Sequence, residues 1–159
     1  MSTCRSTFPF QSEKAVRSFP KQMLNTDFLR KQPIFSLPLP GLDNAMGFQV
    51  SGHDMEELIQ PHDYVIGSRI DGYEQLSQGN IYVIITSSQV IVKRLKEIDG
   101  RMLTLGSDNP DYGIKGVAII SVKEIWEVRY IVSGSMRQIR GTGSGKDKGK
   151  KDGKREFEG

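Results

Sequence analysis

The sequence predicts a mostly β fold, a small barrel or sandwich of short strands with one short helix. The chain of 159 residues is long enough for one hydrophobic core. Its apolar residues concentrate between Phe35 and Val132, where β-branched runs alternate with turn-forming residues. We therefore expect one domain at 34–134, preceded by a polar leader or arm at 1–33 and followed by a disordered Gly/Lys-rich tail at 135–159.

Alternating apolar residues and β-branched runs define the expected strands, which fall at 47–51, 64–70, 81–86, 89–95, 101–105 and 117–132. The segment 53–60 has apolar residues at helical spacing and is followed by Pro61, so we expect a short helix there. Prolines punctuate 33–41, which favours an edge strand or an extended arm. Within the leader, 23–31 is expected to form one or two helical turns.

The basic character of the chain comes from its tail. Residues 137–159 hold eight of the 22 Lys and Arg residues and four of the 19 Asp and Glu residues, which leaves 14 basic and 15 acidic residues elsewhere. We therefore expect no direct nucleic-acid binding by the core, and Lys93 and Arg94, as neighbours in a strand, face opposite sides. A single cysteine, Cys4, and no secretion signal or membrane-length apolar run favour a cytoplasmic protein without membrane association.

Five short motifs occur in series across 34–132. They are VSGHDMEELI at 50–59, His62-Asp63 before a β-rich run, Gly79-Asn80-Ile81, Val92-Lys93-Arg94-Leu95, and Asp108-Asn109-Pro110-Asp111-Tyr112. In order and spacing they resemble the C-terminal domain of LexA, phage repressors and UmuD, the self-cleaving serine–lysine peptidases related to signal peptidase. Each motif is weak alone, but five in series on a β-rich chain are specific. The strand EIWEVRYIV at 124–132 resembles the Bacteroidetes repressor-like branch of that family.

The resemblance assigns roles to residues of two motifs. The position of the family's nucleophilic serine falls on Asp54, and that of its general-base lysine falls on Lys93. Gly52 and Met55 fall on the turn whose backbone N–H groups stabilise the oxyanion in the family, and Asp63 falls on a structural turn position. No cofactor and no metal is implied.

Asp54 changes the chemistry that the resemblance implies. A serine–lysine pair works because a neutral lysine takes the hydroxyl proton and the serine oxygen attacks a carbonyl. A carboxylate is a poor nucleophile toward an amide and stabilises a neighbouring ammonium, so we expect an ion pair between Asp54 and Lys93 and a peptidase fold without activity. No Ala-Gly or Cys-Gly bond of the self-cleaved type precedes residue 52.

The predicted function is therefore a catalytically inactive, LexA-like regulatory module in transcriptional control or the SOS stress response. It would act by dimerising, or by binding its arm or a partner protein such as a DNA-binding subunit. The resemblance implies a homodimer formed through 124–132, although Trp126 equally suits a core position. The alternative is an active self-processing peptidase that uses Asp54 and Lys93 differently.

Two other groups of residues suggest different chemistry. The residues His53, Asp54, His62 and Asp63 offer ligands for a divalent metal, but their spacing matches no common zinc pattern, so a metal-binding domain is the weaker alternative. Ser51, Ser87 and Ser88 are candidates for a displaced nucleophile. The first precedes the turn and the other two suit a hairpin turn, so we expect none of them to be catalytic.

Overall fold

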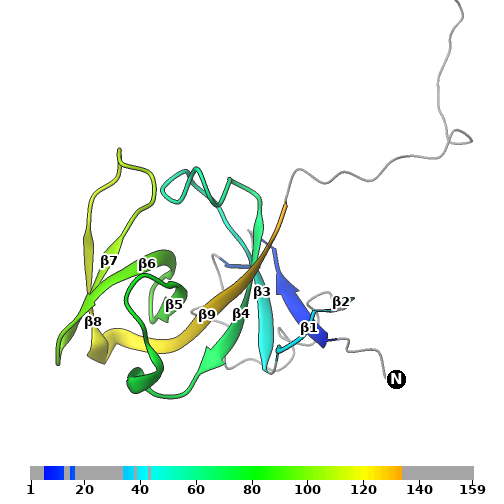
Figure 1. Ribbon diagram of the computed structural model, residues 1–159, viewed down its shortest axis with the longest axis horizontal. Coiled ribbons are helices and arrows are strands. Elements are labelled where there is room, and N and C mark those ends of the chain that lie inside the picture. Colours follow the sequence, from blue (N-terminus) through cyan, green and yellow to red (C-terminus); the bar gives the residue numbers. More distant parts are fainter. Residues whose placement is uncertain (1–5, 13–14, 17–33, 38, 43, 134–159) are drawn as a thin grey trace, which may run out of the picture.

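The computed structural model describes residues 6–12, 15–16, 34–37, 39–42 and 44–133. In these ranges the chain forms nine strands and two 3₁₀ helices (Figure 1). In chain order they are β1 (Ser6–Gln11), β2 (Ile34–Leu37), β3 (Ala45–Gln49), β4 (Tyr64–Ile70), η1 (Tyr73–Gln75), β5 (Ile81–Thr86), β6 (Val90–Ile98), β7 (Met102–Gly106), β8 (Lys115–Ala118), η2 (Ile119–Ser121) and β9 (Val122–Val132). The predicted mostly β fold is confirmed.

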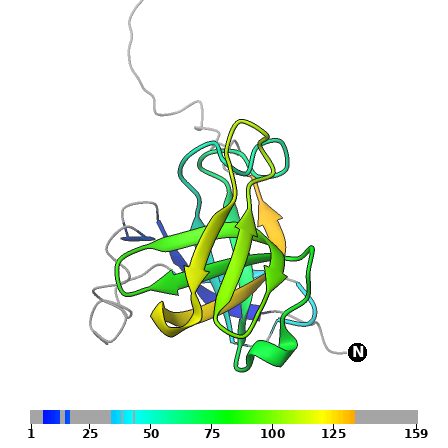
Figure 2. The ribbon, with the colours of Figure 1, turned by 90° about the vertical axis from the view of Figure 1, so that its left-hand side faces the viewer.

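All nine strands belong to one strongly bent sheet, in the order β2-β1-β3-β4-β9-β5-β6-β7-β8. The strand β9 is the longest and pairs antiparallel with both β4 and β5. It crosses the molecule and joins the β1–β4 half to the β5–β8 half, as Figures 1 and 2 show from two sides. The bend gives the domain its barrel-like form.

The central strand β5 is buried on both faces, because it separates two cores. Its odd-numbered residues, Ile81, Val83 and Ile85, pack in one core with Phe48, Met55 and Trp126. Its even-numbered residues face a second core, and that core contains Tyr82, Ile84, Leu95, Leu103 and Leu105. Side chains alternate across a strand, so a continuous apolar run is what such a shared wall requires. The unbroken segment IYVIIT is therefore explained by its position.

The side chain of Trp126 occupies a core position. Its side chain is 5% exposed and meets Phe48 edge to face, with ring centroids 5.8 Å apart. The indole Nε1–H donates to Glu124 Oε1 at 3.0 Å. Trp126 is a core residue in this fold.

Several elements differ from the sequence predictions. The run 117–132 is not one strand, because η2 interrupts it between β8 and β9. The strand β1 lies in the predicted leader and pairs with β2 and β3. The proline-rich segment does supply an edge strand, β2, at the end of the sheet. The helical turns expected at 23–31 and the tail at 135–159 lie outside the described residues.

The short helix expected at 53–60 is absent, and consecutive turns take its place. In an α-helix the carbonyl of Asp54 would accept a bond from the N–H four residues later. Here it accepts from the backbone N–H of Asn109 at 3.0 Å instead. Only the bond from Ile59 N–H to the Met55 carbonyl, 2.9 Å long, follows the helical pattern. A contact with a distant loop therefore overrides the local helical spacing.

Among the described residues, no helix is long and apolar enough to cross a membrane.

Gly67 lies opposite a bulge in β9, since Ile66 faces Tyr130 and Gly67 faces Val128, so that Arg129 is skipped in the pairing. A Cβ atom at this position would lie 2.8 Å from the Trp126 Cβ and 3.2 Å from the Glu127 carbonyl oxygen. The strands can approach this closely only because residue 67 has no side chain.

We predict that Gly67→Ala destabilises the domain by about 1–3 kcal/mol, because the added methyl group must displace packed backbone. Urea denaturation followed by tryptophan fluorescence measures the change. The matched control is Gly100→Ala, at a turn where nothing lies within 4 Å of the added carbon. Equal stabilities of the two variants would contradict the close approach at β4 and β9.

Candidate functional site

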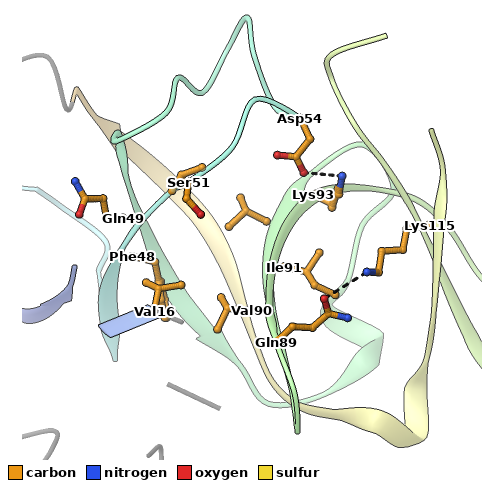
Figure 3. Close-up of a pocket in the computed structure, with 12 residues that line it drawn as sticks. Val16, Phe48, Gln49, Ser51, Asp54, Gln89, Val90, Ile91, Lys93 and Lys115 are labelled. Atoms are coloured by element: carbon orange, nitrogen blue, oxygen red, sulfur yellow. Dashed lines mark hydrogen bonds and ion pairs between the residues drawn. The ribbon is translucent and has the colours of Figure 1, made fainter. Parts of the chain in front are cut away.

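Asp54 and Lys93 meet at one end of a cleft (Figure 3). Lys93 lies in β6 and Asp54 in the turn after β3, and the Lys93 Nζ atom is 2.6 Å from Asp54 Oδ2. Their side chains are 11% and 26% exposed, so the pair is largely withdrawn from water. The ion pair expected from the sequence is present.

The turn that carries Asp54 is held at both ends by backbone hydrogen bonds. Val50 N–H donates to the Asp63 carbonyl at 2.7 Å, and His62 N–H donates to the Val50 carbonyl at 2.8 Å. Gly52 has a φ of +89°, a conformation that residues with a Cβ rarely adopt. Asp63 is buried, and its Oδ2 accepts from Gln60 N–H at 2.9 Å, a contact typical of a turn aspartate.

Three consecutive residues of the loop after β7 connect this turn to β6. Ser107 Oγ accepts from Lys93 Nζ at 2.6 Å. Asp108 receives two bonds from Arg94, Nε to Oδ1 at 2.8 Å and Nη2 to Oδ2 at 2.7 Å. Asn109 Nδ2 donates to the His53 carbonyl at 2.9 Å, beside its backbone bond to Asp54. The loop thus fixes the strand and the turn relative to each other.

Ser107 was not singled out from the sequence, although it contacts Lys93. Its hydroxyl also donates to the Gly113 carbonyl at 3.3 Å, which closes the loop. Ser107 immediately precedes the motif residue Asp108 in the sequence, but only the fold brings its hydroxyl beside Lys93.

The cleft beside the ion pair has a volume of about 230 Å³. Apolar side chains from three parts of the chain form much of its lining, among them Val16, Phe48, Val90 and Val92. Its polar lining residues are Gln49, Ser51, Asp54, Gln89, Lys93 and Lys115. Because Val16 lies in the predicted leader, an N-terminal segment helps to form the cleft.

A family model described as Peptidase S24-like matches residues 19–127, which includes every residue of the ion pair, the turn and the connecting loop. The chain belongs to the Peptidase S24-like family. No curated protein matches the chain. The S24-like assignment agrees with the resemblance to the LexA and UmuD type, and the mostly β fold agrees with it.

The cations of the S24-like motif at β6 are engaged within the domain. Lys93 donates to Asp54 and Ser107, and Arg94 is paired with Asp108. Both charges are therefore neutralised by carboxylates.

The four candidate metal ligands do not converge. His53 Nδ1 lies 2.6 Å from Glu56 Oε1, Asp54 is paired with Lys93, and Asp63 is buried in its turn. In the part of the chain that the structure describes, no three His, Cys, Asp or Glu side chains are placed to hold one ion. In the described structure, His53, Asp54, His62 and Asp63 are thus not gathered around one point.

The three serines that are candidates for a displaced nucleophile lie in two separate places. Ser87 and Ser88 are exposed in the turn between β5 and β6, where Thr86 N–H donates to the Gln89 carbonyl at 3.0 Å. Ser51 is exposed and lines the cleft. The hydroxyl that contacts Lys93 belongs instead to Ser107.

The ion pair between Arg94 and Asp108 has a consequence for acid stability. The guanidinium of Arg94, mainly through its hydrogen bonds, holds the pKa of the Asp108 carboxyl below its usual value, and Lys96 adds to the effect. The same contact raises the pKa of Arg94. A carboxyl whose pKa is lower in the folded state stabilises the fold above its unfolded pKa, and that contribution is lost as the pH falls through the folded pKa.

We predict that Asp108→Asn lowers the free energy of unfolding near pH 7 by about 0.5–1.5 kcal/mol, the size expected of a partly exposed bidentate pair. The difference from the native protein should shrink as the pH falls below about 4, the ordinary pKa of an aspartate in an unfolded chain, and should be lost below the lowered pKa of Asp108 in the folded state. Urea denaturation at several pH values measures both quantities. Glu57→Gln is the control, because Glu57 is exposed and has no ion-pair partner among the described residues. A difference that stays constant down to pH of about 3 would contradict this account.

Proposed function

We propose that this S24-like domain is a catalytically silent peptidase-fold module that binds an extended polypeptide segment in its cleft. It would serve transcriptional or stress-response regulation of the SOS type. The observation that carries the proposal is the ion pair of 2.6 Å between Asp54 and Lys93 at the end of that cleft. The motif assigns the family's serine to residue 54, which here carries a carboxylate.

The chemistry of the ion pair supports the absence of peptidase activity. An acyl-enzyme needs a hydroxyl nucleophile and a base with a free lone pair. Asp54 offers no hydroxyl. Lys93 donates to two oxygens, one on Asp54 and one on Ser107, so its amine is engaged as a donor. The replacement therefore removes the nucleophile and occupies the base in one step.

The pairing of β6 supports binding in the cleft. On one side β6 pairs with β5 from Val90 to Arg94, whereas among the described strands its pairing with β7 begins only at Arg94. Thr86 and Gln89 form a hydrogen-bonded pair, and such pairs alternate along an antiparallel ladder. The N–H and C=O groups of Val90 and Val92 consequently point away from β5, toward the open side. These two residues line the cleft, so an extended segment can add to β6 there.

The segment bound in this cleft is either the chain's own arm or a partner chain, such as a DNA-binding subunit. Val16 lines the cleft and Ala15 is buried, so the N-terminal part already approaches it. A module that binds without cutting holds its occupant reversibly, which suits regulation by assembly.

Dimerisation forms the second part of the proposal. Residues 125–127 are paired with β4 on one side and β5 on the other, so they cannot pair with another subunit. Pairing with β5 stops at Glu127, however, and the described part of the chain places no strand beyond β9 on that side from 128 to 132. Exposed Leu58 and Ile131 lie along a hollow at this edge. We propose that a homodimer forms through 128–132, as the resemblance of 124–132 to the repressor-like branch implies.

The chemical part of the proposal predicts the behaviour of Asp54→Ser. The variant should regain a hydroxyl beside Lys93 and react with a serine-directed phosphonate probe, faster at alkaline pH because the amine must be neutral. Intact-mass spectrometry measures the adduct and any self-cleavage. The native chain should show neither.

Asp54→Ser/Lys93→Met is the matched control, since it keeps the new hydroxyl and removes the amine. Self-cleavage of the native chain would overturn the proposal. Absence of reaction in Asp54→Ser would mean that the cleft no longer supports peptidase chemistry, although the silent state itself would stand.

The dimer predicts a concentration-dependent mass. Sedimentation velocity should show the native chain associating, and Ile131→Asp should remain monomeric because the substitution buries a charge at the pairing edge. Ile120→Asp is the control, at a 91% exposed position in η2. Equal association of both variants would remove β9 from the interface.

A further inference from the structure

The cleft carries one charge that its own lining does not compensate. Asp54 and Lys93 neutralise each other at one end. Lys115, at the start of β8, also lines the cleft, and its Nζ donates to Gln89 Oε1 at 3.4 Å (Figure 3). Among the described residues, no carboxylate lies within ion-pair distance of Lys115. Among the described lining residues, Lys115 is therefore the one charge without an ion-pair partner.

The geometry of the cleft restricts what can meet that ammonium group. A segment added to β6 would run beside Val90 and Val92, with successive side chains on opposite faces. The partly exposed side chains of Val90 and Val92 favour apolar side chains on such a segment. Gln89 directly precedes Val90, the first residue of β6. Its contact with Lys115 therefore places the Lys115 ammonium group near the beginning of β6.

We propose that the cleft selects an extended segment of a partner chain that carries a carboxylate opposite Lys115, between apolar side chains. This inference rests on the proposed function, because it takes the cleft to hold its occupant uncut. The carboxylate would replace the long contact to Gln89 with a charge-assisted hydrogen bond. The partner is thus an acidic and apolar peptide segment rather than a purely apolar one.

The charge of the cleft disfavours a nucleic-acid strand as the occupant. Such a strand carries one phosphate for each nucleotide and binds to grooves with several cations and exposed aromatic rings. This cleft offers one uncompensated cation, and its aromatic lining residue, Phe48, is fully buried. A single carboxylate matches a single ammonium.

Binding of defined peptides to the full chain tests the proposal. The probes are fluorescein-labelled, C-terminally amidated peptides of about eight residues that alternate valine and serine, with one glutamate placed at each position in turn. Each has a glutamine counterpart. Fluorescence polarisation should show one glutamate register binding about three- to fivefold tighter than its glutamine counterpart, the size expected of a partly exposed ion pair.

Two variants locate the effect. Lys115→Met keeps most of the aliphatic stem and should make the glutamate and glutamine peptides bind equally. Lys123→Met removes an exposed lysine outside the cleft lining and should leave the preference intact. The preference should also weaken between about 0.05 M and about 0.5 M salt, where screening reduces exposed ion pairs.

The outcomes separate this inference from the proposed function. No binding by any peptide, or a glutamate preference that survives Lys115→Met, would overturn the assignment of Lys115. Mass spectrometry of the same mixtures reports whether the native chain cuts the probes. Cleavage would overturn the silent-module proposal while leaving a measured glutamate preference in place.

Discussion

The double-sided burial of β5 is the constraint on which the rest of the domain depends. A strand buried on both faces needs a core on each side, and here both cores include residues of β5 and β9. The sheet must bend around this shared wall to close both cores. Among the described strands, β6 has no partner on its second side before Arg94, and the cleft lies along that part of the strand.

The loop after β7 converts this arrangement into a defined site. Ser107, Asp108 and Asn109 contact Lys93, Arg94 and the turn at 53–54 respectively. Each contact is an ordinary hydrogen bond or ion pair, worth about 1 kcal/mol alone. Together they fix two segments that are about forty residues apart in the sequence. The short motifs thus supply contact partners for one another.

Much of the fold was predictable because runs of β-branched and other apolar residues mark buried strands. The runs at 64–70 and 81–86 coincide with β4 and β5, whose apolar residues define them in any context. The ion pair was predictable because the resemblance placed residues 54 and 93 together. Pairings between distant segments were not. In β1, Phe8 and Phe10 alternate but Pro9 separates them, and at 53–60 the spacing of Met55 and Ile59 indicates a helix, whereas the Asp54 carbonyl accepts from Asn109.

Ser107 and Lys115 illustrate the same limit within the site. Both lie outside the motif residues that suggested chemistry, and both are common residue types on strand ends. Their roles depend on side chains from β6 that the sequence alone does not bring near. A site residue that acts through tertiary contact therefore leaves no pattern for periodicity or spacing to detect.

The ion pair between Asp54 and Lys93 also bears on the function of the cleft. A largely buried pair roughly offsets its own desolvation, so well-packed apolar residues at positions 54 and 93 could stabilise the domain equally well. Such residues would fill the polar end of the cleft and join its apolar walls. The pair instead keeps that end polar and electrically neutral, with Ser107 fixing the ammonium. Neutralisation at this end leaves Lys115 as the one cleft-lining charge without an ion-pair partner among the described residues, so Lys115 is the charge that an occupant would meet.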